Sequence, residues 1–114
     1  MNLHLENVNL QSTSGPNHFA SKLIKYMQKS DVTFDYNRRA DARLAFIETQ
    51  ANSPSETPLF QRLDGIYFNT EQPYQLQNTN IQRTYDSAAG VIFQSHFNKN
   101  LTTAYFGEHH NGTV

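Results

Sequence analysis

The sequence predicts a single α/β domain whose sheet is mostly parallel, has about five strands and is covered by helices on both faces. Short apolar segments alternate along the chain with segments of helical periodicity, which indicates strands joined by helical crossovers. Two of the strand candidates are continuously apolar, as strands buried on both faces of a parallel sheet are. The length of 114 residues is typical of one domain.

The first third of the chain predicts a strand, a helix and a second strand. Residues 3–10 alternate imperfectly between apolar and polar side chains, which favours an extended segment. Ser14 is suited to cap the next helix, and Pro16 suits its first turn because an N–H group would be unpaired there anyway. Apolar residues then recur at helical spacing up to residue 29, namely Phe19, Leu23 and Met27. A β-prone segment follows at residues 32–36.

The middle of the chain predicts two more strands and a polar helix. Residues 44–47 are continuously apolar and favour a buried central strand. Residues 49–58 carry little apolar content and predict a loop, and residues 63–68 form the next strand candidate. The helix begins near Gln75. We expect its buried side to hold Ile81, Tyr85 and Ala88, and its solvent side to hold Asn78 and Gln82.

The last third predicts a strand, a helix and the start of another strand. Residues 90–94 form a short apolar strand, and Ser95 is a plausible N-cap for the helix that Gly107 ends. Residues 108–114 lead into a further strand. We expect the aromatic side chains of the helices to face the interior, namely Phe19, Tyr26, Phe97 and Tyr105.

The composition argues against several classes of function. The formal net charge of −1 provides no basic surface field for nucleic acid or anionic lipid. The absence of cysteine excludes disulfides, thiolate catalysis and the commonest structural zinc sites. The first ten residues lack the pattern of a secretion signal, and no apolar run is long enough to span a bilayer. We therefore predict a cytoplasmic protein with neither nucleic acid nor a membrane as its partner.

Histidines and one loop are the first candidates for chemistry. The loop at residues 12–17 joins a strand to a helix N-terminus, where free N–H groups attract anions and Gly15 would allow a phosphate to approach. The alternative is an ordinary capped turn. His96, in the first turn of the last helix, could accept a proton or contact a sugar hydroxyl, or be a plain surface side chain. The adjacent His109 and His110 lack a third ligand nearby, which argues against a metal site.

Two carboxylates offer a further candidate. Glu48 and Asp64 could be imagined as the acid and base of a glycoside hydrolase. Asp64 has a closer explanation, because Arg62 lies two residues before it and two residues at this spacing in a strand project to the same side. We predict a structural ion pair between Arg62 and Asp64.

Three stretches of the chain together resemble a known family. They are Ser-Gly-Pro-Asn-His-Phe at residues 14–19, Phe-Gln-Arg-Leu-Asp-Gly-Ile-Tyr-Phe-Asn at residues 60–69, and Gly-Val-Ile-Phe-Gln-Ser-His-Phe at residues 90–97. They are similar to the amino-terminal half of glycosyltransferases of the GT-B fold, in the large family 4 group. The middle stretch is the most specific of the three.

The resemblance implies a two-domain enzyme in which each half is Rossmann-like and a nucleotide-sugar donor lies in the cleft between them. Members transfer the sugar to an acceptor with retention of configuration. The amino-terminal half mainly holds the acceptor, a saccharide or another hydroxyl compound. The carboxyl-terminal half binds the nucleotide and supplies a pair of glutamates. The resemblance calls for no cofactor.

The resemblance also implies positions for the site. The loop after the first strand approaches the donor diphosphate, which places Gly15 and Asn17 there; Ser14 stands where the family usually has a glycine. The residues expected at strand ends facing the cleft are Asn69, Gln94, Ser95 and His96. Residues 1–114 match one half of the enzyme. We therefore predict a chain truncated before its donor-binding domain and inactive until a second domain or partner chain supplies that half.

Two alternatives belong to other classes. The Ser-Thr-Ser-Gly stretch at residues 12–15 also resembles the phosphate loop of flavodoxin-like proteins, which would make the chain a flavin-binding electron carrier. This alternative does not account for the motif at residues 62–68. A third hypothesis is a binding module that retains the saccharide acceptor site but has no catalytic activity.

Overall fold

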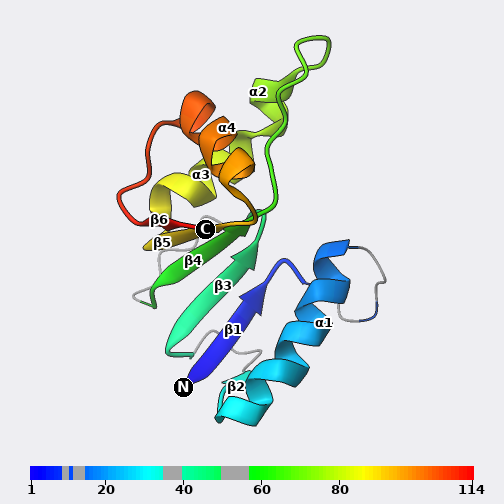
Figure 1. Ribbon diagram of the computed structural model, residues 1–114, viewed down its shortest axis with the longest axis vertical. Coiled ribbons are helices and arrows are strands. Elements are labelled where there is room, and N and C mark those ends of the chain that lie inside the picture. Colours follow the sequence, from blue (N-terminus) through cyan, green and yellow to red (C-terminus); the bar gives the residue numbers. More distant parts are fainter. Residues whose placement is uncertain (9–10, 12–14, 35–39, 50–56) are drawn as a thin grey trace.

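A computed structural model of the chain describes residues 1–8, 11, 15–34, 40–49 and 57–114. Within these residues the chain forms a six-stranded, all-parallel sheet in the order β2-β1-β3-β4-β5-β6 (Figure 1). The strands are β1 (Asn2–Glu6), β2 (Thr33–Phe34), β3 (Ala42–Phe46), β4 (Leu59–Leu63), β5 (Gly90–Phe93) and β6 (Gly112–Thr113). The predicted α/β class and parallel sheet are confirmed, with one strand more than expected.

Helices lie on both faces of the sheet, which gives three layers. They are α1 (Gly15–Met27), the 3₁₀ turn η1 (Gln28–Ser30), α2 (Tyr74–Gln77), α3 (Thr79–Ser87) and α4 (His96–Phe106). In Figure 1, α1 lies beside β1 and β3, whereas α3 and α4 lie near β4, β5 and β6. The arrangement is compatible with a Rossmann-like domain.

The two faces of the sheet carry separate cores, because successive side chains of a strand point to opposite sides. One core packs against α1 and consists of Leu3, Val32 and Ala42 with Met27, Phe34 and Phe60 around it. The other packs against α3 and α4 and consists of Leu63, Ile66, Ile81, Tyr85, Ala88, Val91 and Phe93. The second core is larger and more deeply buried. The α3/α4 side therefore provides most of the hydrophobic stabilisation.

Helix α1 follows its sequence pattern. Ala20 is fully buried at the centre of the inner side, and Phe19, Leu23 and Met27 flank it along one stripe. The helix tightens into η1, and Asp31 adopts a left-handed conformation with φ 59° that ends it. Ser14, the predicted N-cap, lies outside the described residues. So do the ends of the strands predicted at 3–10 and 32–36, and most of the predicted 49–58 loop.

Strand β4 lies earlier in the chain than predicted. The sequence indicated a strand at residues 63–68, but pairing covers Leu59–Leu63 and stops there. In the five paired residues burial alternates, with Leu59, Gln61 and Leu63 buried against the helices. After Leu63 the chain leaves the sheet, and Ile66 packs instead into the α3/α4 core. Of the apolar residues after Asp64, only Ile66 thus fills the core, whereas Tyr67 and Phe68 are exposed.

Asn78 is buried, whereas we expected it to face water. It precedes α3, is 3% exposed, and its side chain both accepts from the Tyr67 N–H at 2.9 Å and donates to the Tyr67 carbonyl at 2.7 Å. This pair of bonds satisfies the backbone of a loop residue as a neighbouring strand would. Gln82 is exposed and Ile81, Tyr85 and Ala88 are buried, as predicted.

The four helix aromatics expected in the interior are exposed, and that prediction was wrong. Tyr26 is 75% and Phe97 is 72% exposed, and Phe19 and Tyr105 are more than one third exposed. In α4 the fully buried position is Thr102, so the apolar spacing 97-101-105 does not mark the side that meets the sheet. Of that series only Leu101 packs against the core, together with Phe106.

The ends of α4 agree with the sequence. The Ser95 hydroxyl accepts a hydrogen bond from the Asn98 N–H at 3.1 Å, as an N-cap does. Gly107 has φ 88° and ends the helix. The chain then reaches β6, which confirms the strand predicted after residue 108.

Two glycines allow aromatic rings to approach the sheet. A Cβ atom on Gly90 would lie 2.9 Å from the ring of Phe60, and one on Gly112 would lie 2.9 Å from the ring of Phe93. Both distances are shorter than real contacts of a Cβ atom allow. Each ring therefore occupies the place of an absent side chain.

Tyr85 makes the stability of the folded chain depend on pH. Its hydroxyl donates to the Gly107 carbonyl at 2.6 Å. Burial raises the pKa of Tyr85 above its ordinary value of 10.0, and the carboxylates of Asp86 and Glu108 raise it further. Because the folded chain holds this proton more tightly than the unfolded chain, the contribution is complete below the ordinary pKa and is lost as the pH rises through the folded-state pKa.

Tyr85→Phe should lower the free energy of unfolding by about 1 kcal/mol at neutral pH through the lost hydrogen bond. It should also make the decline in stability above about pH 10 shallower than in the wild type. Urea unfolding across this range measures both effects. Tyr26→Phe, at an exposed position, is the matched control and should change neither. An alkaline decline identical to that of the wild type would contradict the role of Tyr85.

Candidate functional site

The carboxyl ends of the strands form one edge of the sheet, where ligands of parallel α/β domains bind. The helix after β1 runs back towards β2, whereas β3 leads on to β4 at the other side, so the chain changes direction between β1 and β3. Asn7 and Ile47 follow these two strands. The Asn7 side-chain amide donates to the Phe46 carbonyl at 2.9 Å and holds the two strand ends together.

The backbone is strained at this point. Asn7 has φ 59° and Ile47 has φ 71°. Asparagine tolerates this left-handed region, but a β-branched isoleucine rarely adopts it. The Ile47 N–H donates to the Arg62 carbonyl and its own carbonyl accepts from the Gln61 side chain, so hydrogen bonds to β4 fix the conformation. Strain of this kind is concentrated at functional sites.

The two residues predicted near a diphosphate lie at the start of α1. Gly15 is its first residue and is exposed, and a Cβ atom placed on it would meet none of the described residues within 4 Å. Asn17 lies in the same turn and is half-buried, and its carbonyl accepts from the Ser21 hydroxyl. Within the described part of the chain, nothing occupies the space in front of Gly15.

The other predicted residues follow β4 and β5. Gln94 and His96 are exposed, and Ser95 is occupied as the cap of α4. The Gln94 N–H donates to the Leu63 carbonyl at 3.1 Å, which holds these two strand ends together. Asn69 is exposed in the loop after β4, where its side chain accepts from the Glu71 N–H. Gln94 and His96 thus share one edge with free access, while Ser95 has a structural role.

Arg62 and Asp64 form the predicted ion pair at this edge. The guanidinium also lies over the ring of Phe19, 3.9 Å from its centroid, in a cation–π contact between β4 and α1. Phe19 in turn contacts Phe46 at 6.2 Å between ring centroids. Nothing in the spacing of the sequence brings residue 19 to residue 62.

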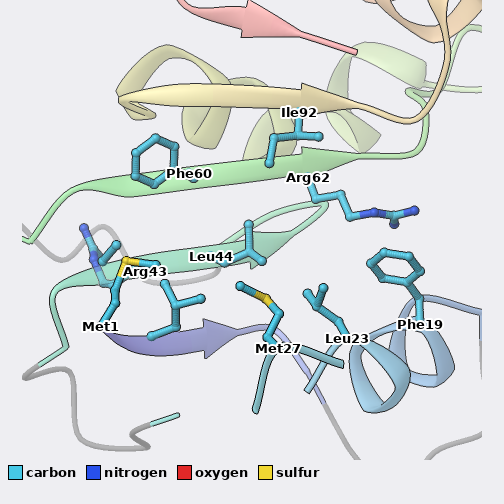
Figure 2. Close-up of a pocket in the computed structure, with 11 residues that line it drawn as sticks. Met1, Phe19, Leu23, Met27, Arg43, Leu44, Phe60, Arg62 and Ile92 are labelled. Atoms are coloured by element: carbon cyan, nitrogen blue, oxygen red, sulfur yellow. The ribbon is translucent and has the colours of Figure 1, made fainter. Parts of the chain in front are cut away.

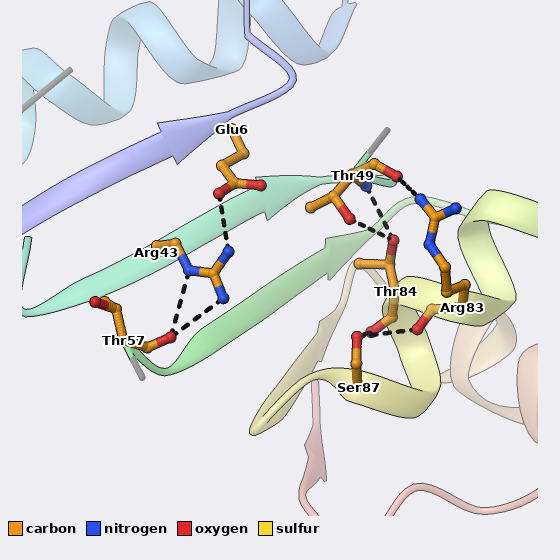
Figure 3. A network of polar contacts seen from close by, with 7 residues as sticks. All are labelled: Glu6, Arg43, Thr49, Thr57, Arg83, Thr84 and Ser87. Carbon is orange, nitrogen blue, oxygen red and sulfur yellow. Dashed lines mark hydrogen bonds and ion pairs between the residues drawn. The ribbon is translucent and has the colours of Figure 1, made fainter. Parts of the chain in front are cut away.

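A polar network lies on the opposite face (Figure 3). Arg43 of β3 forms an ion pair with Glu6 of β1 at 3.1 Å and donates twice to the Thr57 carbonyl. Thr49 donates through its N–H to the Thr84 hydroxyl, and its carbonyl accepts from Arg83. These bonds attach the end of β3 to α3. Because every group drawn has a partner, the network is a structural element.

An apolar groove lies between α1 and the sheet (Figure 2). Its volume is about 480 Å³. One wall comes from α1 and the floor comes from the strands, with Phe19, Leu23, Met27, Leu44, Phe60 and Ile92 among its lining residues. Arg62 lies at the end towards the carboxyl edge, and Met1 lies at the other end. The groove thus connects the inside of the α1 layer with the edge where Gln94 and Gly15 lie.

The histidines near the carboxyl terminus are held by structural contacts. His109 makes a hydrogen bond through Nε2 to the Ala88 carbonyl, accepts from the Asn111 N–H through Nδ1, and stacks on His110 at 4.4 Å. Among the described residues, no group of three or more His, Asp or Glu side chains is placed to hold a metal ion. In the same part of the chain, no helix has the length and apolarity needed to cross a membrane.

Comparison with known proteins adds no family to these observations: no family model, curated protein or solved structure matches the chain.

Proposed function

We propose that this chain is the acceptor-side half of a retaining glycosyltransferase of the GT-B type. One observation carries the proposal. The three stretches that resemble the family all reach the same edge of one parallel sheet: residues 15–19 begin α1, residues 60–69 run from β4 into its following loop, and residues 90–97 run from β5 into α4. The second and third stretches are in direct contact, because β4 pairs with β5 over Phe60–Leu63 and Gly90–Phe93.

The chemistry of the edge supports the proposal. The first turn of α1 has the positive end of the helix dipole, which suits a diphosphate, and no described residue lies within 4 Å of a Cβ position on Gly15. Asn69, Gln94 and His96 are exposed hydrogen-bonding side chains of the kind that orient hydroxyl groups. Sugar transfer also needs the donor held with its reacting carbon about 3 Å from the acceptor oxygen. This half provides one wall of such a cleft, and we expect it to be inactive alone.

Nucleotide-sugar binding by the chain alone tests the proposal. UDP-glucose and GDP-mannose at millimolar concentration should shift the amide NMR signals of Gly15, Asn17 and residues 94–96 and leave those of β6 unchanged. Gly15→Trp should weaken this binding at least about tenfold, because a bulky side chain fills the diphosphate position. The melting temperature should stay within a few degrees of the wild-type value, since the position is open.

Gly15→Ala is the matched control and should retain most of the binding. Shifts that are absent for both nucleotide sugars, or that are unchanged by Gly15→Trp, would contradict the proposal.

The strand order favours a second candidate. The first five strands follow the order 2-1-3-4-5, which is also the order of flavodoxin-like domains, with FMN at the point where the order changes direction. A flavin-binding electron carrier is therefore the alternative. Purified chain that is yellow, and that releases FMN on denaturation, would establish it in place of the transferase. Colourless protein that gains no absorbance on FMN addition would remove it.

A further inference from the structure

The apolar groove between α1 and the sheet differs from an ordinary gap in a core. Of the elements that the structure describes, only α1 covers this face, and Ile92 in its floor is 41% exposed, whereas the neighbouring residue Val91, on the opposite face, is almost fully buried. Apolar surface in a concave site of 300–1,000 Å³ is typical of small-molecule sites. The groove, at about 480 Å³, is within that range.

The length of the groove suits an extended hydrocarbon chain. Phe19, Leu23 and Met27 line it over nine helical residues, whose eight rises of 1.5 Å give about 12 Å. A single hydrocarbon chain can lie along this length in contact with apolar side chains.

Two arginines line the groove, one at each end. Arg43 lies at the Met1 end, where its guanidinium is held by the ion pair and hydrogen bonds described above. Arg62 reaches towards Phe19 at the end near the carboxyl edge, and apolar side chains line the part between (Figure 2). The N-terminal turn of α1, with its positive dipole end, lies at the same mouth, and Lys22 is exposed one turn further along the helix. Arg62 pairs with Asp64 but presents further N–H donors in its planar fork. This mouth complements an anionic head group.

We propose that the groove binds a single-chain anionic amphiphile. Its hydrocarbon chain lies along Leu23, Leu44 and Phe60, and its head group lies at Arg62 on the carboxyl edge. The assignment of this amphiphile as the sugar acceptor rests on the proposed function, because the head would then lie beside Gly15 and Gln94. Binding itself does not depend on that function.

Decanoate, below its micelle concentration, is the test ligand. It should shift the methyl NMR signals of Leu23, Leu44 and Ile92, and hexanoate should bind at least about tenfold more weakly because it buries fewer methylene groups. Decanol and decyltrimethylammonium, with the same chain, should bind more weakly than decanoate. Equal binding by decyltrimethylammonium, or no shift with decanoate, would overturn the proposal.

Two substitutions separate the groove from unspecific binding. Ile92→Trp fills the floor of the groove and should weaken decanoate binding about tenfold or more. Leu76→Trp, at a position that is 74% exposed on α2 and does not line the groove, is the matched control and should bind as the wild type does. Arg62→Gln should reduce decanoate binding to the level of decanol, and Arg62→Lys should restore part of it. Retained melting temperatures show that each variant is folded.

Sedimentation velocity tests the other occupant, a second copy of the chain. A dimer that Ile92→Trp abolishes would overturn the amphiphile proposal and show self-association through this face. A monomeric chain that binds decanoate would support the amphiphile proposal. Decanoate binding without any nucleotide-sugar binding would support the amphiphile site and contradict the transferase proposal. Nucleotide-sugar binding without decanoate binding would contradict only the amphiphile site.

Discussion

Leu63→Ala is expected to lower the free energy of unfolding by about 2–5 kcal/mol, the range for a large aliphatic side chain removed from a closed core. Leu63 is fully buried at the end of β4, where it packs with Ile66, Ile81 and Phe93 beneath α3 and α4. Neighbouring side chains held by two helices cannot collapse fully into the cavity. A domain of this size has only about 5–15 kcal/mol of total stability, so the variant would be close to unfolding at 37 °C.

Ile92→Ala is the matched control for Leu63→Ala. Ile92 belongs to the adjacent strand but faces the groove and is partly exposed, so we expect a loss below about 1.5 kcal/mol. Urea unfolding monitored by circular dichroism measures both variants. Equal losses would mean that the groove side is as tightly packed as the α3/α4 side, and would remove the basis for an open face.

Asn78→Ala should cost about 2–4 kcal/mol, the second large effect. The substitution removes both hydrogen bonds to Tyr67 and leaves a backbone N–H and carbonyl without these partners. Amide hydrogen exchange should show that the loop at residues 64–73 loses protection while β1 keeps its protection.

Asn78→Asp is the informative second variant. A carboxylate still accepts from the Tyr67 N–H but cannot donate to its carbonyl, so its loss of stability should lie between those of the wild type and Asn78→Ala at neutral pH. Thr79→Ala, in the next residue and exposed, controls for helix propensity. A loss in Asn78→Ala no larger than in Thr79→Ala would show that the two bonds contribute little.

Local signals predicted most of the elements. The helical stripe of α1, the Ser95 cap and the Gly107 end of α4 depend on residues within a few positions of one another, and these predictions are confirmed. The apolar run at residues 90–93 likewise predicted strand β5. In each case the information lies within one segment.

Features that depend on distant partners could not be predicted. The bounds of β4 are set by pairing with β3 and β5. Apolar residues recur among polar ones from Leu59 to Phe68, and this pattern does not reveal which five residues enter the sheet. Asn78 looks like a surface residue until Tyr67 is placed beside it. The outward-facing Phe97 and Tyr105 show that regular spacing identifies a helix without identifying the side that is covered.

The candidate site also has features that the sequence could predict and features that it could not. The positions of Gly15, Gln94 and His96 at one edge follow from the order of strands and helices, which the sequence predicted. The strain at Ile47, the stacking of Arg62 on Phe19 and the groove arise from contacts between segments far apart in the chain. The sequence contains no periodic signal for such contacts.

Gly90 and Gly112 control the alignment of the last two strands with their neighbours. If β5 slid by one residue along β4, the branched side chain of Val91 would be driven into the ring of Phe60, which only a glycine admits. The same slip of β6 would press a threonine onto Phe93. Each aromatic ring would therefore have to shift to admit a residue that has a Cβ atom. We expect this steric conflict to disfavour misaligned pairing in this half of the sheet.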